Sequence, residues 1–320
     1  MSALIFDILL LVGGIGVLYF GAEWLVRGSA RLAGSLGISP IVVGLTVVSF
    51  GTSAPELVVA TTAAMTGSAD LAVGNVMGSN LANIGLILGV TALIRPLQVA
   101  SRVVWREMPL MLLVTVAIYP LAWDGGLSRM DGVILLVALA AYLVFVFRSV
   151  EEEAPDILGE YEEFMQASAQ MENRVDWRDV ALILVGCGGL VLGGRAIVEG
   201  ALAVADALQI SEVVIGLTVV AVGTSLPELA TSLVAALRQE ADIAVGNVIG
   251  SNIFNLAAIL GVASLLEPLQ FSDTVLSREL PAVLVLSLLV FPLLRTEWRI
   301  QRWEGALLLG SYVGIGFWLL

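Results

Sequence analysis

Apolar residues fill most of this chain, in runs as long as a lipid bilayer is thick and separated by short polar segments. A helix needs about 17–25 mostly apolar residues to cross the hydrocarbon core of a membrane. Ten segments meet this description, with edges soft by several residues: 4–26, 38–65, 70–93, 104–123, 130–148, 178–200, 210–236, 241–265, 279–295 and 302–320. The pattern predicts an all-α polytopic membrane protein with ten transmembrane helices.

The composition excludes several classes of function. Of the 320 residues, 58% are apolar and 13% are charged, whereas soluble domains have about 45–50% and 25%. Histidine is absent and Cys187 is the single cysteine, so histidine-based catalysis, histidine-bound zinc and cysteine metal clusters are impossible. The net charge of −13 argues against nucleic acid as a partner.

Charge placement predicts the orientation in the membrane. Residues 150–176, between the fifth and sixth spans, carry seven acidic residues: Glu151, Glu152, Glu153, Asp156, Glu160, Glu162 and Glu163. We interpret them as a solvated linker, with a regulatory cation-binding segment as the alternative. Twelve of the 15 arginines would lie on the same side as this segment. Because basic residues stay cytoplasmic, the acidic loop is expected in the cytoplasm and both termini outside it, across the cell's inner (plasma) membrane.

The chain contains an internal repeat with a constant offset of 172 residues. The sequence GTSAPE at 51–56 recurs as GTSLPE at 223–228, and GNVMGSN at 74–80 recurs as GNVIGSN at 246–252. Residues 1–149 and 177–320 are therefore expected to be two five-helix repeats, joined by the acidic loop. Since five is an odd number, the second repeat would run through the membrane inverted. Inverted repeats are typical of secondary transporters, whose substrates bind at mid-membrane between the repeats.

Two carboxylates lie at matched positions deep inside apolar segments. Glu56 and Glu228 have no arginine within reach along their own helices, and a charge at that depth costs about 2.5–3.5 kcal/mol on insertion scales. Pro55 and Pro227 break the helical hydrogen bonding beside them and free backbone carbonyls. Hydroxyls stand close by, from Thr52, Ser53, Thr224 and Ser225. The alternative is a pair of protonated, merely tolerated glutamates.

Polar residues also follow one face of the next span in each repeat. They are spaced i, i+4, i+8: Asn75, Ser79 and Asn83 in the first repeat, and Asn247, Ser251 and Asn255 in the second. Glycines at 74, 78, 246 and 250 would allow close helix packing, but packing alone needs neither carboxylates nor amides. All these candidate ligands are oxygens, which suit Ca²⁺ and Na⁺, and two glutamates balance one divalent cation.

At these motifs the sequence resembles the cation/calcium exchanger superfamily, and most closely the prokaryotic sodium/calcium exchangers. The resemblance covers essentially the whole chain. It implies antiport of Ca²⁺ against Na⁺ by alternating access, with two peripheral gating helices moving past a fixed core. It implies no cofactor, and we infer no partner beyond the transported ions and the bilayer. The cation ligands that it implies are Glu56, Glu228, the hydroxyls of Thr52, Ser53, Thr224, Ser225, Ser79 and Ser251, the amides of Asn83 and Asn255, and the carbonyls of Ser49 and Ala221.

One position departs from part of that family. Asn255 stands where potassium-dependent exchangers, and some prokaryotic members, have an aspartate. The amide lowers the negative charge of the centre, which argues against K⁺ co-transport. Three other functions were considered: a Ca²⁺/H⁺ antiporter of the same fold, a passive cation channel and an intramembrane enzyme. The enzyme would need a nucleophile–base pair or a metal triad, which the missing histidine and the single cysteine make hard to build.

Overall fold

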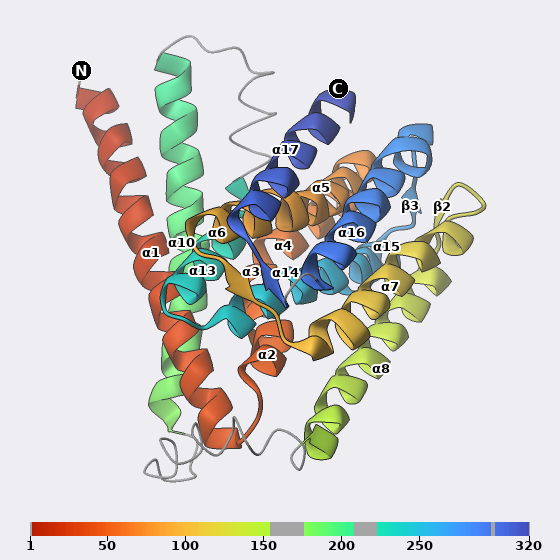
Figure 1. Ribbon diagram of the computed structural model, residues 1–320. Helices are drawn as coiled ribbons and strands as arrows, with labels where there is room; N and C mark the ends of the chain where they lie inside the picture. Colours follow the sequence, from red (N-terminus) through yellow and green to blue (C-terminus); the bar gives the residue numbers. More distant parts are fainter. Residues whose placement is uncertain (1, 154–175, 208–222, 296–297, 320) are drawn as a thin grey trace.

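A computed structural model describes residues 2–153, 176–207, 223–295 and 298–319 as a bundle of helices (Figure 1). The first half contains helices α1 (Ser2–Leu36), α2 (Pro40–Val43), α3 (Ser49–Thr52), α4 (Ala54–Met65), α5 (Ala69–Leu81), α6 (Leu88–Ile94), α7 (Met108–Leu121) and α8 (Arg129–Glu153), the π-helical segments η1 (Gly44–Val48), η2 (Ala82–Ile87) and η3 (Val103–Glu107), and the strands β1 (Leu97–Gln98) and β2 (Gly126–Leu127).

The second half repeats most of these elements. It contains helices α10 (Trp177–Ala207), α13 (Leu226–Leu237), α14 (Ala241–Phe254), α15 (Leu260–Leu266), α16 (Leu280–Arg295) and α17 (Arg302–Leu319), the π-helical segments η5 (Asn255–Ile259) and η6 (Val275–Glu279), and the strands β3 (Leu269–Gln270) and β4 (Arg299–Ile300). Helices α4 and α13, and likewise α6 and α15, begin and end exactly 172 residues apart. The repeated motifs therefore fold into repeated elements.

The helices identify a polytopic membrane protein. Within the described residues, seven helical segments are long and apolar enough to cross a membrane, and the bent pair Pro40–Thr52 and Ala54–Met65 makes up to eight. Most of the expected seventh span lies outside the described residues, where only Leu226–Leu237 is seen. The expected tenth span, α17, is not among the seven, since Arg302, Glu304 and four glycines lower its mean hydropathy. The count of ten therefore stays a prediction, and most of the acidic loop, residues 154–175, lies outside the described residues.

Short strands connect the two halves reciprocally. Strand β1 of the first half pairs antiparallel with β4 of the second, with Leu97 opposite Ile300. Strand β2 of the first half pairs antiparallel with β3 of the second, with Gly126 opposite Gln270. Each half thus contributes the strand after its third expected span and the strand before its fifth. A two-fold relation between the halves would produce this exchange.

The centre of the bundle is formed by the two continuous segments α5–η2–α6 and α14–η5–α15. Helix α14 is buried on all sides from Ile243 to Phe254. It packs against α2, η1 and α3 of the first half and against α13 of its own. Polar side chains on such a helix have no access to water, so each must find a partner in the protein or bind a ligand.

Helices α1 and α10 form a separate pair at one edge of the bundle, side by side over most of their length (Figure 1). Glycines recur every seven residues on both helices: Gly14, Gly21 and Gly28 on α1, and Gly186, Gly193 and Gly200 on α10. A Cβ atom at Gly21 would lie 2.8 Å from the Leu190 nitrogen, and one at Gly200 would lie 2.9 Å from the Leu11 nitrogen. The two backbones are therefore in direct contact, as small residues allow between membrane helices.

An ion pair ties this edge pair to the rest of the bundle. The guanidinium of Arg238, just after α13, donates to the largely buried Glu23 carboxylate on α1. Arg27, one turn further along α1, also donates to Glu23, at 3.4 Å. Between the edge helices themselves, Arg31 lies 3.7 Å from Asp179.

We expect Gly21→Val to destabilise the protein, because its side chain would overlap the α10 backbone. Overpacking typically costs about 1–3 kcal/mol, which for a chain of this size corresponds to a melting temperature lower by roughly 3–10 °C. Thermal unfolding of the detergent-purified protein measures this shift. Gly13→Val on the same helix is the matched control, since no described atom lies within 4 Å of its Cβ position. Equal shifts in the two variants would contradict backbone contact as the basis of the pair.

Candidate cation site

The backbone breaks beside both conserved-spacing glutamates, at matched points in the two halves. Helix α3 ends at Thr52, Ser53 adopts φ −82° and ψ 5°, and α4 starts at Ala54 with Pro55 in its first turn. Ser225 adopts φ −87° and ψ 4° before α13 in the same way. Proline fits the first turn of a helix because its missing N–H would have no partner there. The predicted break is confirmed, and it places Glu56 and Glu228 in the first turns of α4 and α13.

The two glutamates are fully enclosed by protein, with 1% of Glu56 and 0% of Glu228 exposed. The Ser53 hydroxyl donates to Glu228 Oε1 at 3.1 Å, across the two halves. Glu228 Oε2 and both carboxylate oxygens of Glu56 have no hydrogen-bond partner among the described residues. A helix N-terminus stabilises negative charge by only about 0.3–1 kcal/mol, less than burying a carboxylate costs. The pair therefore needs a positive ion or protons.

Other oxygens from the expected ligand set share this property. Asn83 Oδ1, Asn255 Oδ1 and Ser225 Oγ are buried without a hydrogen-bond partner in the described part of the chain. Buried polar atoms normally have partners. A few further ones without partners lie on residues outside the expected set: Ser29, Thr91, Thr231, Asn252 and Glu304. The coincidence of carboxylate, amide and hydroxyl oxygens at the repeated motifs is what a cation-binding cage requires.

Hydrogen bonds between the halves hold the first-half motif against α14. The Thr52 hydroxyl donates to Asn247 Oδ1 at 3.0 Å and lies 3.5 Å from Ser251 Oγ. The Asn247 amide nitrogen donates to Ser232 Oγ at 3.0 Å and to the Glu228 carbonyl at 3.4 Å. With its amide nitrogen donating to these two groups, Asn247 must present its oxygen to Thr52.

The Ser49 hydroxyl adds to the same junction. It donates to the Gly44 carbonyl at 2.7 Å and to the Asn247 carbonyl at 3.1 Å. Helix packing is close here too: a Cβ at Gly246 would lie 2.9 Å from the Ile41 carbonyl oxygen. The predicted close approach is confirmed for Gly246 and Gly250. At Gly74 and Gly78 no described atom lies within 4 Å of a Cβ position, and the segment corresponding to α2–η1, residues 212–220, is outside the described residues.

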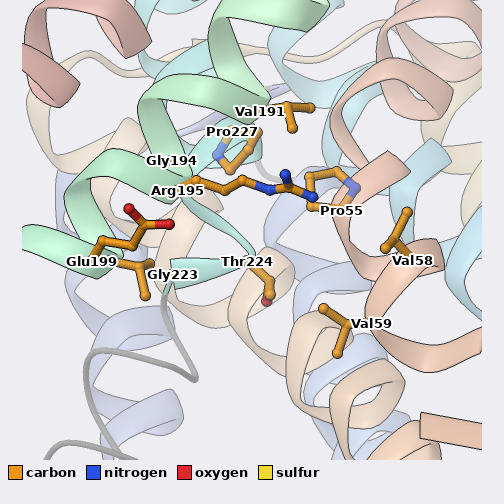
Figure 2. Close-up of a pocket in the computed structure, with 11 residues that line it drawn as sticks. Pro55, Val58, Val59, Val191, Gly194, Arg195, Glu199, Gly223, Thr224 and Pro227 are labelled. Atoms are coloured by element: carbon orange, nitrogen blue, oxygen red, sulfur yellow. The ribbon is translucent and has the colours of Figure 1, made fainter. Parts of the chain in front are cut away.

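The remaining expected ligands are placed differently. Ser79 and Ser251 are buried, at 3% and 0% exposed. Thr224 is half-buried and lines a cavity of about 360 Å³ together with Pro55 and Pro227, which precede the two glutamates (Figure 2). Arg195 of α10 extends across this cavity toward Pro55, and Glu199 stands at its side. Ala221 lies outside the described residues.

The structure also shows polar neighbours that the sequence interpretation left out of the ligand set. Asn80 and Asn252 contact Asn255 and Asn83 across the halves. Their recurrence as the last residue of the GNVxGSN motif is a signal that could have found them. Ser232 had no such signal, because the corresponding residue in the first half is Ala60.

The chemistry of this set favours a hard cation. Within the described residues no group of three or more histidines, cysteines or acidic residues could hold a metal ion. The site therefore combines two carboxylates with neutral hydroxyl and amide oxygens. Ca²⁺ accepts about 6–8 such ligands in flexible geometry, whereas transition metals prefer nitrogen and sulfur.

Comparisons with known proteins agree with this chemistry. The family model described as sodium/calcium exchanger protein matches residues 6–148 and 179–320. The chain is 39% identical to the inner membrane protein YrbG of Escherichia coli, covering 95% of this chain and 94% of the relative. It is 32% identical to the sodium/calcium exchanger MaX1 of Methanosarcina acetivorans, covering 96% of each. A solved structure of the sodium-calcium exchanger NCX_Mj superposes with a TM-score of 0.81 at 34% identity, covering 97% of each chain.

We expect Glu56→Gln and Glu228→Gln each to weaken Ca²⁺ binding at least about 100-fold, because either change halves the charge that faces a divalent ion in a low-dielectric site. Isothermal titration of the detergent-purified variants measures the affinity. Glu304→Gln is the matched control: Glu304 is equally buried, but its Oε2 accepts from the Gln301 backbone in the first turn of α17. Near-normal affinity in either site variant would remove that glutamate from the ligand set.

Proposed function

The chain belongs to the sodium/calcium exchanger protein family, and on that premise we propose that it exchanges Ca²⁺ for Na⁺ by alternating access. A member of this family is a cation exchanger and not an enzyme. In our proposal the ions bind at mid-membrane between two inverted five-helix repeats, residues 1–149 and 177–320. The protein would reside in the inner (plasma) membrane with both termini outside the cytoplasm.

The observation that carries the proposal is the set of buried oxygens without hydrogen-bond partners at the two motifs. It includes both oxygens of Glu56 and one each of Glu228, Asn83, Asn255 and Ser225. We assign the ligand roles to these residues, and to Thr52, Ser53, Thr224, Ser79, Ser251 and the carbonyls of Ser49 and Ala221 from the resemblance of their motifs.

Charge balance explains why such a site would exchange ions. With no cation bound, two carboxylates in a water-excluded bundle are costly to enclose. One Ca²⁺ neutralises them, whereas a single Na⁺ would leave one negative charge uncompensated, so more than one Na⁺ is needed per transit. The protein can then close around either load more easily than around the empty site. This constraint would couple the outward flux of one ion to the inward flux of the other.

The hydrogen-bond pattern favours metal ions over protons as the coupling species. A protonated carboxyl group becomes a hydrogen-bond donor and needs an acceptor. Neither oxygen of Glu56 has a hydrogen-bond partner among the described residues, and the partner of Glu228 Oε1 is the Ser53 hydroxyl acting as donor. With no histidine in the chain, a Ca²⁺/H⁺ antiporter would have to use these same glutamates as proton carriers.

The architecture supports alternating access. The constant offset of 172 residues and the reciprocal pairing of β1 with β4 and β2 with β3 fit a two-fold relation between the halves. The edge pair α1–α10 is held together by backbone contact through its glycines. We propose that it moves as one unit past the central segments α5–η2–α6 and α14–η5–α15, which keep the site fixed.

We expect ⁴⁵Ca²⁺ uptake into proteoliposomes to follow an imposed Na⁺ gradient and to stop when Li⁺ or choline replaces Na⁺. A pH gradient alone should drive no uptake. Replacing K⁺ by choline should leave the initial rate within about twofold, since Asn255 offers a dipole but no charge to a further monovalent ion. The Glu56→Gln protein is the control for leak. Uptake that follows the pH gradient instead would establish the proton-coupled alternative.

The topology predicts which segments are accessible from outside the cell. With Cys187 replaced by serine, a single cysteine introduced within residues 151–163 should react with an impermeant maleimide only after the cells are permeabilised. A cysteine added at either terminus should react in intact cells. The reason is the arginine asymmetry, which keeps the acidic loop in the cytoplasm. Labelling of residues 151–163 in intact cells would reverse the orientation.

A further inference from the structure

We propose that Asn80 is a positioning residue, which fixes the side-chain amide of Asn255 so that its oxygen is free to bind the cation. This inference rests on the proposed cation site and extends it to a residue that does not itself bind the ion. Asn80 ends the first GNVxGSN motif on α5, whereas Asn255 begins η5 of the other half. Both side chains are buried, at 0% exposed.

The orientation of Asn80 follows from a partner that can only accept. Its amide nitrogen lies 3.5 Å from the backbone carbonyl oxygen of Asn252 and donates to it. A carbonyl has no hydrogen to give, so a flipped Asn80 would place two oxygens against each other. The Asn80 amide oxygen therefore faces the other way.

The orientation of Asn255 follows in turn from that of Asn80. Asn255 Nδ2 donates to Asn80 Oδ1 at 3.0 Å. A flipped Asn255 would bring its oxygen against the Asn80 oxygen and lose this bond. Asn255 Oδ1 is thus held away from Asn80, and it is buried with no hydrogen-bond partner among the described residues. An oxygen fixed in place without a partner is already arranged for a cation, so binding need not first reorient it.

The mirrored pair in the other half lacks this anchor. Asn83 Nδ2 donates to Asn252 Oδ1 at a longer 3.5 Å. Asn252 Nδ2, which would have to hold Asn252 in that orientation, has no partner in the described part of the chain. The orientation of Asn83 is therefore less constrained than that of Asn255, although the two residues occupy matched positions.

A double-mutant cycle on Ca²⁺ affinity tests the inference, since residues that act through one another are non-additive. Isothermal titration with CaCl₂ would compare wild type, Asn80→Leu, Asn255→Leu and the double variant. We expect Asn80→Leu to weaken binding about 10-fold and Asn255→Leu by at least as much. The double variant should be no weaker than Asn255→Leu alone, because Asn80 then has no amide to position.

The chain supplies its own matched control. Asn83 lies one turn from Asn80 on the same continuous helix, but Asn80 makes no hydrogen bond to it. The losses from Asn80→Leu and Asn83→Leu should therefore multiply. Ser264→Ala, which removes a buried hydroxyl bonded within α15, controls for general effects of core substitutions. Asn80→Ala, a smaller change, repeats the cycle should the leucine variant fail to fold.

The outcomes separate this inference from the proposed function. Losses that multiply for Asn80 with Asn255, or an Asn80 variant with wild-type affinity, would overturn the positioning role while leaving the site in place. A wild-type protein that binds no Ca²⁺ would overturn both. A wild-type protein that binds Ca²⁺ but does not couple its transport to Na⁺ would overturn the proposed exchange alone, and the cycle would still decide the role of Asn80.

Discussion

The structure depends on two carboxylates buried in a helix bundle without a cationic side chain beside them. Glu56 and Glu228 lie where water cannot reach, and among the described residues only the Ser53 hydroxyl donates to them. Elsewhere in the bundle a buried glutamate is treated differently: Glu107 receives hydrogen bonds from Arg102 and from Tyr142, at 3.2 and 3.1 Å. That contrast separates a carboxylate neutralised by the protein from two that must be neutralised by something transported.

The surroundings of the glutamates are built from backbone breaks and from contacts between the halves. Each break ends one helix and starts another with proline in its first turn, which brings a serine and a glutamate to the same point. Ser53 reaches Glu228 and Thr52 reaches Asn247, so neither half completes the site alone. A site shared in this way is sensitive to the relative position of the halves, as alternating access requires.

Two kinds of helix packing divide the bundle. The central segments are enclosed on all sides and carry the polar side chains, whereas α1 and α10 expose large apolar residues such as Phe20 and Leu192 on their outer faces. Glycine contact makes the edge pair a unit, and the ion pair of Glu23 with Arg238 joins it to the turn after α13. The corresponding positions in the other half are Arg195 and Thr66, which cannot form that ion pair, so the attachment is asymmetric.

The sequence by itself determined the class of the protein, the repeat and the chemistry of the centre. Long apolar runs can only be satisfied in a bilayer as helices, and a constant offset needs no coordinates to be seen, so Glu56, Glu228 and their proline breaks were predictable. The orientation of each amide was not, because it depends on which groups of the other half lie within hydrogen-bonding distance. Tertiary structure decided that Asn247 faces Thr52, that Asn80 holds Asn255, and that Ser232, matched by Ala60 in the first half, supports only one of the two motifs. Spacing along one helix identifies residues that share a face, but only the packing of two helices selects the partner of each polar atom.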